Sequence, residues 1–104
     1  ENLSGEFIQP TIESGSIALK NLDIENKLAQ MNPNPKEKGA YPISTLTWIW
    51  VYQSGYGEKL SNIKITLNFL LSKEANKKAL KLGFIPLNKQ MQDHAIRSIN
   101  DIGI

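Results

Sequence analysis

The chain has 104 residues, enough for one domain at roughly 100–200 residues per domain and too few for a complete two-lobed receptor or enzyme. Its formal net charge of +2 and its pI of about 8.9 give too weak a field to indicate nucleic acid or an anionic membrane as the partner. Because cysteine is absent, disulfides, thiolate metal sites and cysteine nucleophiles are excluded, and the single histidine leaves little for catalysis.

The N-terminal residues have none of the features of a secretion signal. The chain begins at Glu1, with no Met, no basic segment and no apolar segment of the signal-peptide type. The longest apolar run, residues 48–52, has the length of a strand and is too short to cross a bilayer. We therefore expect a mature or excised segment of a protein, without a membrane span.

A first helix is predicted for residues 11–22. Pro10 precedes it, and Glu13 lies in its first turn, where a carboxylate faces the positive end of the helix dipole.

Residues 23–40 contain Pro33 and Pro35 among alternating charges. Neither a helix nor a sheet accommodates that composition, so we expect an exposed loop.

A strand is predicted for residues 41–52, which are rich in β-branched and aromatic side chains. Beyond Thr47 both of its faces are apolar, which is typical of a strand covered by helices on each side. We expect Trp48, Trp50 and Tyr52 to be buried on one face. The alternative is that these three rings form an exposed stacking surface for bases or sugars.

Three more helices are predicted after this strand. Apolar residues at helical spacing mark the first of them over residues 58–71; they are Leu60, Ile63, Leu67, Leu70 and Leu71. For the second, Ser72 is the expected N-cap and Gly83 the expected left-handed residue at the C-terminus. Asn88 is the expected N-cap of the last helix, which extends to about residue 100.

Three segments, in this order and spacing, resemble the C-terminal third of the periplasmic phosphate-binding proteins of bacterial phosphate ABC importers. They are residues 7–14 (FIQPTIES), residues 40–49 (AYPISTLTWI), and residues 67–71 (LNFLL) followed by residues 79–87 (ALKLGFIPL). The chain departs from the family pattern at Asn88, where a second proline is usual. The loop at residues 32–38 is also shorter and richer in proline than in many members.

The resemblance implies an α/β fold, the C-terminal part of a two-lobed periplasmic-binding-protein fold of type II, with one buried strand and three to four helices. The whole chain, 1–104, is then a single fragment. Residues 1–46 match the end of the second lobe and the return crossing, and residues 47–104 match the closing strand and helices of the first lobe.

The function implied by the resemblance is that of the substrate-binding component of a phosphate importer. Such a protein is not an enzyme; it lies in the periplasm or otherwise outside the cytoplasm, lipid-anchored or soluble, and delivers inorganic phosphate to permease subunits. Its phosphate ligands lie upstream of the matched segments. We therefore expect no phosphate-binding, catalytic or metal-binding residue and no cofactor in this chain.

The side chains that could take part in catalysis or binding fit this expectation. We interpret His94 and Arg97 as parts of a solvated helix face, and Asp93, Asp101 and Glu58 as too scattered to form an acid pair. Hydroxyls at the start of the strand are expected to bond the backbone; they are Ser44, Thr45 and Thr47. A group of lysines is expected to be a solvated face and not a surface for nucleic acid or lipid; they are Lys73, Lys77, Lys78 and Lys81.

Two other functions stay open at this point. One is an extracytoplasmic phosphatase or adhesion-type relative with the same fold. The other is a small independent interaction domain that uses the aromatic face of residues 48–52. The interaction domain would be a monomer that exposes both indole groups. For the receptor fragment we expect no nucleic-acid partner, and we expect self-association through exposed strand edges, because the strands that would pair with this one are missing from the chain.

Overall fold

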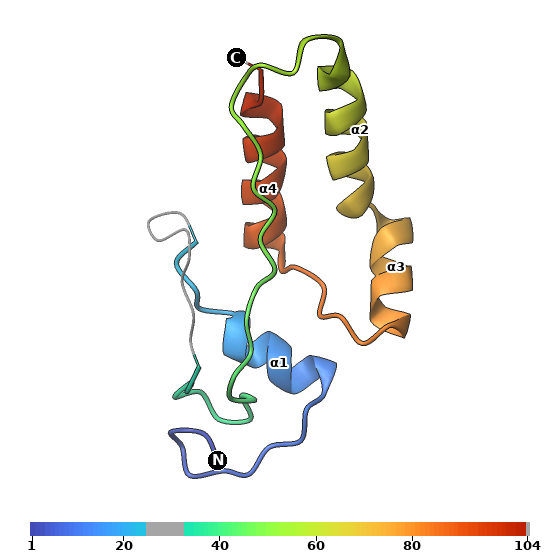
Figure 1. The fold of residues 1–104 in the computed structure, drawn as a ribbon. Coiled ribbons are helices and arrows are strands. Elements are labelled where there is room, and N and C mark those ends of the chain that lie inside the picture. The colour runs from blue at the N-terminus through green and yellow to red at the C-terminus, as the bar shows by residue number, and fades with distance from the viewer. Residues whose placement is uncertain (25–32, 104) are drawn as a thin grey trace. The chain divides into compact units, whose positions relative to one another are not determined.

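The computed structural model describes residues 1–24 and 33–103, and the chain divides into two compact units, Glu1–Trp48 and Ile49–Ile104 (Figure 1). The described residues form four α-helices and one 3-10 turn, without a strand. The predicted loop at residues 23–40 lies partly outside the described residues. Residues 23–24 and 33–40 form neither helix nor strand, as predicted, but Ile24, Pro35 and Ala40 are buried, so the prediction that the loop is exposed is wrong at these positions.

The prediction of an α/β fold with one buried strand is wrong. In the described part of the chain, residues 44–52 belong to neither a helix nor a sheet. The side chain of Ile49 is 59% exposed and that of Trp50 is 81% exposed. A strand needs a neighbour to receive its backbone hydrogen bonds, and β-rich composition cannot supply that neighbour. The predicted burial of Trp48, Trp50 and Tyr52 fails for the same reason.

The first unit contains α1 (Ile12–Leu19), which starts one residue later and ends three residues earlier than predicted. Its first turn is closed by a capping box, in which the Thr11 hydroxyl accepts from the Ser14 backbone N–H and the Ser14 hydroxyl accepts from the Thr11 N–H. The carbonyl of Ser14 also accepts from the N–H of Tyr41, at 3.0 Å. The buried apolar residues of this unit are Ala18, Leu19, Leu22, Ile24, Pro35 and Ala40.

The second unit is helical. A 3-10 turn (Gly57–Lys59) leads into α2 (Leu60–Leu70), followed by α3 (Lys73–Lys81) and α4 (Lys89–Asp101). The two predicted N-caps are confirmed: the Ser72 side chain accepts from the Ala75 N–H, and the Asn88 side chain accepts from the Met91 N–H. Within this unit α2 contacts both α4 and α3 (Figure 1).

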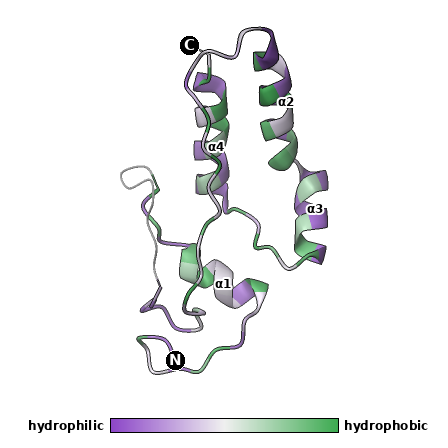
Figure 2. Cartoon of the chain, viewed as in Figure 1, coloured by the Kyte–Doolittle hydropathy of each residue, from purple (hydrophilic) through white to green (hydrophobic). Residues whose placement is uncertain are grey.

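The helix predicted over residues 58–71 is confirmed, but its apolar stripe is not a core. No residue of α2 is buried, and Leu70 at its end is 48% exposed. Apolar and hydrophilic residues alternate around α4 (Figure 2). Among the described residues of this unit, the buried apolar side chains are Met91, Ile99 and Ile102.

As predicted, Gly83 closes the C-terminus of α3 in a left-handed conformation, with a φ of +85°. The Gly83 N–H donates to the carbonyl of Leu80 at 3.1 Å, and the Phe84 N–H donates to the carbonyl of Ala79 at 3.0 Å. These two hydrogen bonds form a Schellman motif, which satisfies carbonyls that the helix itself leaves free. A side chain is disfavoured at residue 83 because its backbone is left-handed.

Replacing Gly83 with Ala is expected to lower the free energy of unfolding by about 1–2 kcal/mol, the cost of a left-handed residue that carries a Cβ. A Cβ at this position meets no atom within 4 Å, so the loss measures the backbone alone. Gly83→Asn is the matched variant, with a smaller expected loss, because asparagine tolerates this conformation better. Urea unfolding followed by circular dichroism compares the two, and equal losses would contradict the assignment.

Candidate functional site

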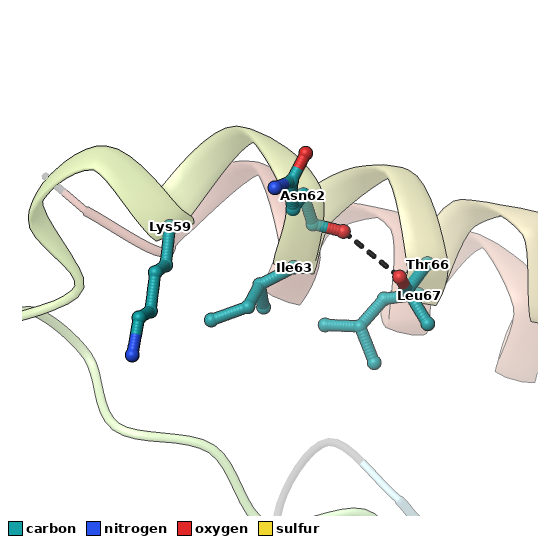
Figure 3. A pocket seen from close by; sticks show the side chains of 5 residues that line it. All are labelled: Lys59, Asn62, Ile63, Thr66 and Leu67. Atoms are coloured by element: carbon teal, nitrogen blue, oxygen red, sulfur yellow. Dashed lines mark hydrogen bonds between the residues drawn. The ribbon is translucent and has the colours of Figure 1, made fainter.

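A shallow groove of about 460 Å³ lies along α2 and the turn before it (Figure 3). The side chains of Lys59, Ile63 and Leu67 extend to the same side of the helix. The Thr66 hydroxyl donates to the backbone carbonyl of Asn62 at 2.9 Å. The groove therefore offers aliphatic contacts and one ammonium group. This lining suits an apolar side chain better than a desolvated anion, which needs several convergent donors.

The structure places His94 and Arg97 on α4, as predicted, with Arg97 exposed and His94 half-buried. Asp93 on the same helix forms an ion pair with Lys89, with 3.1 Å between the carboxylate and the ammonium group. Asp101 ends α4, and its backbone carbonyl accepts from the side-chain amide of Gln53 at 2.7 Å. The two carboxylates are thus held two turns apart on one helix and do not form an acid pair.

Two of the three hydroxyl groups after Tyr41 bond the backbone as the sequence predicts, those of Ser44 and Thr45. The Ser44 hydroxyl is buried and donates to the carbonyl of Tyr41 at 3.1 Å. The Thr45 hydroxyl donates to the carbonyl of Leu46 at 3.4 Å, and Thr47 is exposed. Ser44 and Thr45 are therefore engaged in local turns of the backbone.

The lysines of α3 form a solvated face, which confirms their predicted exposure. Lys78 pairs with Glu74 at 3.5 Å, and both side chains stay mostly exposed. An exposed pair of this kind contributes only about 0–1 kcal/mol and is screened by salt. Lys73, Lys77 and Lys81 recur at intervals of four residues and so share one side of the helix.

A polar cluster that the sequence did not predict lies in the described part of the first unit. It is centred on Asn2, whose side chain is almost fully buried. The Asn2 amide group donates to the Glu6 carboxylate at 3.3 Å and to the carbonyl of Ala40 at 3.1 Å. The Asn2 side-chain oxygen accepts from the N–H groups of Ser4 and Glu6. This cluster joins the N-terminal turn to residues 36–40.

Two carboxylates of this cluster are stabilised in the charged form. The pKa of Glu6 lies below its ordinary value because the Gly39 N–H donates to its carboxylate at 2.8 Å and the Asn2 amide also donates to it. The pKa of Glu37 is lowered chiefly by the Asn21 amide, which donates to it at 3.1 Å. The other carboxylate oxygen of Glu37 is buried without a hydrogen bond.

The cluster contains no group of side chains that could hold a metal ion. Across residues 1–24 and 33–103, no three His, Cys, Asp or Glu side chains come close enough to hold a metal ion. The donors around Asn2 are engaged by acceptors within the cluster, which are the Asn2 side-chain oxygen, the Glu6 carboxylate and the carbonyl of Ala40. The arrangement therefore fixes the local fold of the first unit.

No family model matches the chain, and no curated protein matches it significantly. In the part of the chain that the structure describes, none of the helices has the length and hydropathy needed to cross a membrane. The resemblance in the three sequence segments is therefore an argument from those residues alone.

The charge of Glu6 is expected to make the first unit sensitive to acid. The pKa of the Glu6 carboxyl lies below its ordinary value of 4.5 in the folded chain. The charged carboxylate therefore contributes its full stabilisation above pH 4.5, and this contribution is lost as the pH falls through the pKa of the folded state. An NMR titration of the Gly39 amide should report this protonation. Glu6→Gln keeps an acceptor for Gly39 but should abolish the acid-dependent shift.

Exposed Glu13, in the first turn of α1, provides the control. The variant Glu13→Gln should leave the titration of the Gly39 amide unchanged. A Gly39 signal that titrates identically in the Glu6→Gln variant would show that another group controls this hydrogen bond.

Proposed function

We propose that this chain is the C-terminal part of the substrate-binding component of a bacterial phosphate ABC importer. The complete component is a non-enzymatic protein that captures inorganic phosphate outside the cytoplasm and delivers it to permease subunits. The proposal rests on the resemblance of residues 7–14, 40–49, 67–71 and 79–87 to that family. It does not include the α/β fold that the resemblance implied.

The observation that carries the proposal is where the exposed apolar side chains lie. Phe7 in the first matched segment is 86% exposed, Ile49 in the second is 59% exposed, and Leu82 in the third is 76% exposed. An exposed apolar side chain gains free energy when another part of a protein covers it. The matched segments therefore have the surface expected of chain that packs against the remainder of a larger protein.

The proposal assigns phosphate binding to residues outside this chain. A phosphate dianion loses much hydration on binding, and convergent N–H donors or a guanidinium group compensate that loss. Arg97 is the only arginine, and it lies four residues from Asp93 on one side and four from Asp101 on the other. An anion beside this guanidinium meets two carboxylates. The position of Arg97 thus supports a surface role.

Calorimetric titration tests this assignment. The isolated chain is expected to bind phosphate no more tightly than the millimolar range, about −4 kcal/mol, and Arg97→Ala should not change the result. A longer protein that adds the upstream segments is expected to bind phosphate and to prefer it to sulfate. Micromolar binding by the isolated chain would place a site in these residues, and a longer protein without phosphate binding would contradict the function.

A second candidate function is an independent interaction domain, favoured by the exposure of Trp50 and Tyr52 at 81% each. The two functions differ in what covers these rings. If the chain is part of a receptor, the tryptophan emission should shift to shorter wavelength in the longer protein, because the indole groups become buried. An interaction domain should keep its long-wavelength emission until a partner binds.

A further inference from the structure

The extended segment at residues 48–52 has backbone groups without partners. In the described structure the N–H and carbonyl groups of residues 48–51 make no hydrogen bond. The segment carries the side chains of Ile49, Trp50 and Tyr52, all of them mostly exposed. Unpaired backbone combined with β-forming side chains is the usual template for addition of another strand.

We propose that residues 48–52 pair with the same residues of a second copy of this chain, as an antiparallel ribbon with its two-fold axis at Trp50. The segment alternates aromatic and β-branched residues and has the same pattern in both directions. In this register Trp48 lies opposite Tyr52 of the second copy, and Ile49 lies opposite Val51. Aromatic pairs then share one face and β-branched pairs the other, both of which stabilise antiparallel strands.

Hydrogen bonds already present in the chain select the same register. The N–H of Tyr52 donates to the Tyr56 hydroxyl at 2.7 Å, and the carbonyl of Gln53 accepts from the Gly103 N–H at 2.7 Å. Residues 49 and 51 keep both backbone groups free. In an antiparallel ribbon alternate residues direct their backbone groups to the partner. Ile49 and Val51 therefore exchange hydrogen bonds across the axis, and the ribbon ends before Gln53.

Charge favours a second copy as the occupant. No charged residue occurs between Lys38 and Glu58, whereas α3 and α4 carry both lysines and carboxylates. Two copies can therefore approach along this segment without placing like charges opposite each other. The three aromatic rings of each copy bury at most about 150–250 Å² apiece. A contact of this size lies near the lower end of stable interfaces, about 1,200–2,000 Å², so we expect a dimer in the micromolar range.

Sedimentation equilibrium with charged variants tests the pairing. The unmodified chain should double its 11.7 kDa mass as its concentration rises. Trp50→Lys and Trp50→Glu should each stay monomeric, because two like charges meet at the axis, and an equimolar mixture of the two should recover the dimer. Phe7→Lys changes a similarly exposed aromatic residue of the first unit and should dimerise normally.

Cysteine cross-linking tests the register, because the chain has no cysteine of its own. Trp48→Cys mixed with Tyr52→Cys should form a disulfide faster than either variant alone, since opposed residues in an antiparallel pair approach closely enough for a disulfide. Faster self-linking of Trp48→Cys would overturn the antiparallel register. A chain that stays monomeric at all concentrations, or a Trp50→Lys variant that still dimerises, would overturn the proposal.

These outcomes are independent of the proposed function. Phosphate binding by the longer protein decides whether the chain belongs to a receptor, whereas the mass of the isolated chain decides whether residues 48–52 pair. Far-UV circular dichroism of each variant verifies that the helices are retained. Because residue 50 lies outside every helix, a change in mass with unchanged helix content reports on the pairing alone.

Discussion

In the described part of the second unit, the buried apolar side chains lie on and just after α4, and their burial stabilises the unit; they are Met91, Ile99 and Ile102. Packing of an apolar face is the main source of helix stability in proteins, because isolated helices of this length are marginal in water. α2 has an apolar stripe of the right spacing, yet none of its residues is buried. The unit thus depends on a small core and leaves much of its apolar surface to water.

Those parts of the fold that depend on neighbouring residues could be predicted from the sequence. Ser72 and Asn88 accept hydrogen bonds three residues further along, and Gly83 ends α3 in a left-handed conformation. These interactions are closed within one turn of helix, so residue type and spacing determine them. The helix over residues 58–71 followed from its periodicity for the same reason.

The parts that depend on distant residues could not be predicted. Residues 41–52 have the composition of a strand, but composition does not provide the neighbour that a strand requires. The cluster around Asn2 was missed because its essential contact, to the carbonyl of Ala40, spans most of the first unit. Only the local hydrogen bond from the Ser4 N–H to Asn2 has a sequence signal, that of an asparagine in a turn.

The aromatic segment also has a spectroscopic consequence. The chain contains only two tryptophans, Trp48 and Trp50, and both lie in an extended stretch outside every helix. Its ultraviolet emission therefore reports the surroundings of a few residues, while the dichroism of the peptide groups reports the helices. In a denaturation experiment these two signals follow different events. Coincident curves would mean that this stretch and the helices lose their structure together, as one cooperative transition.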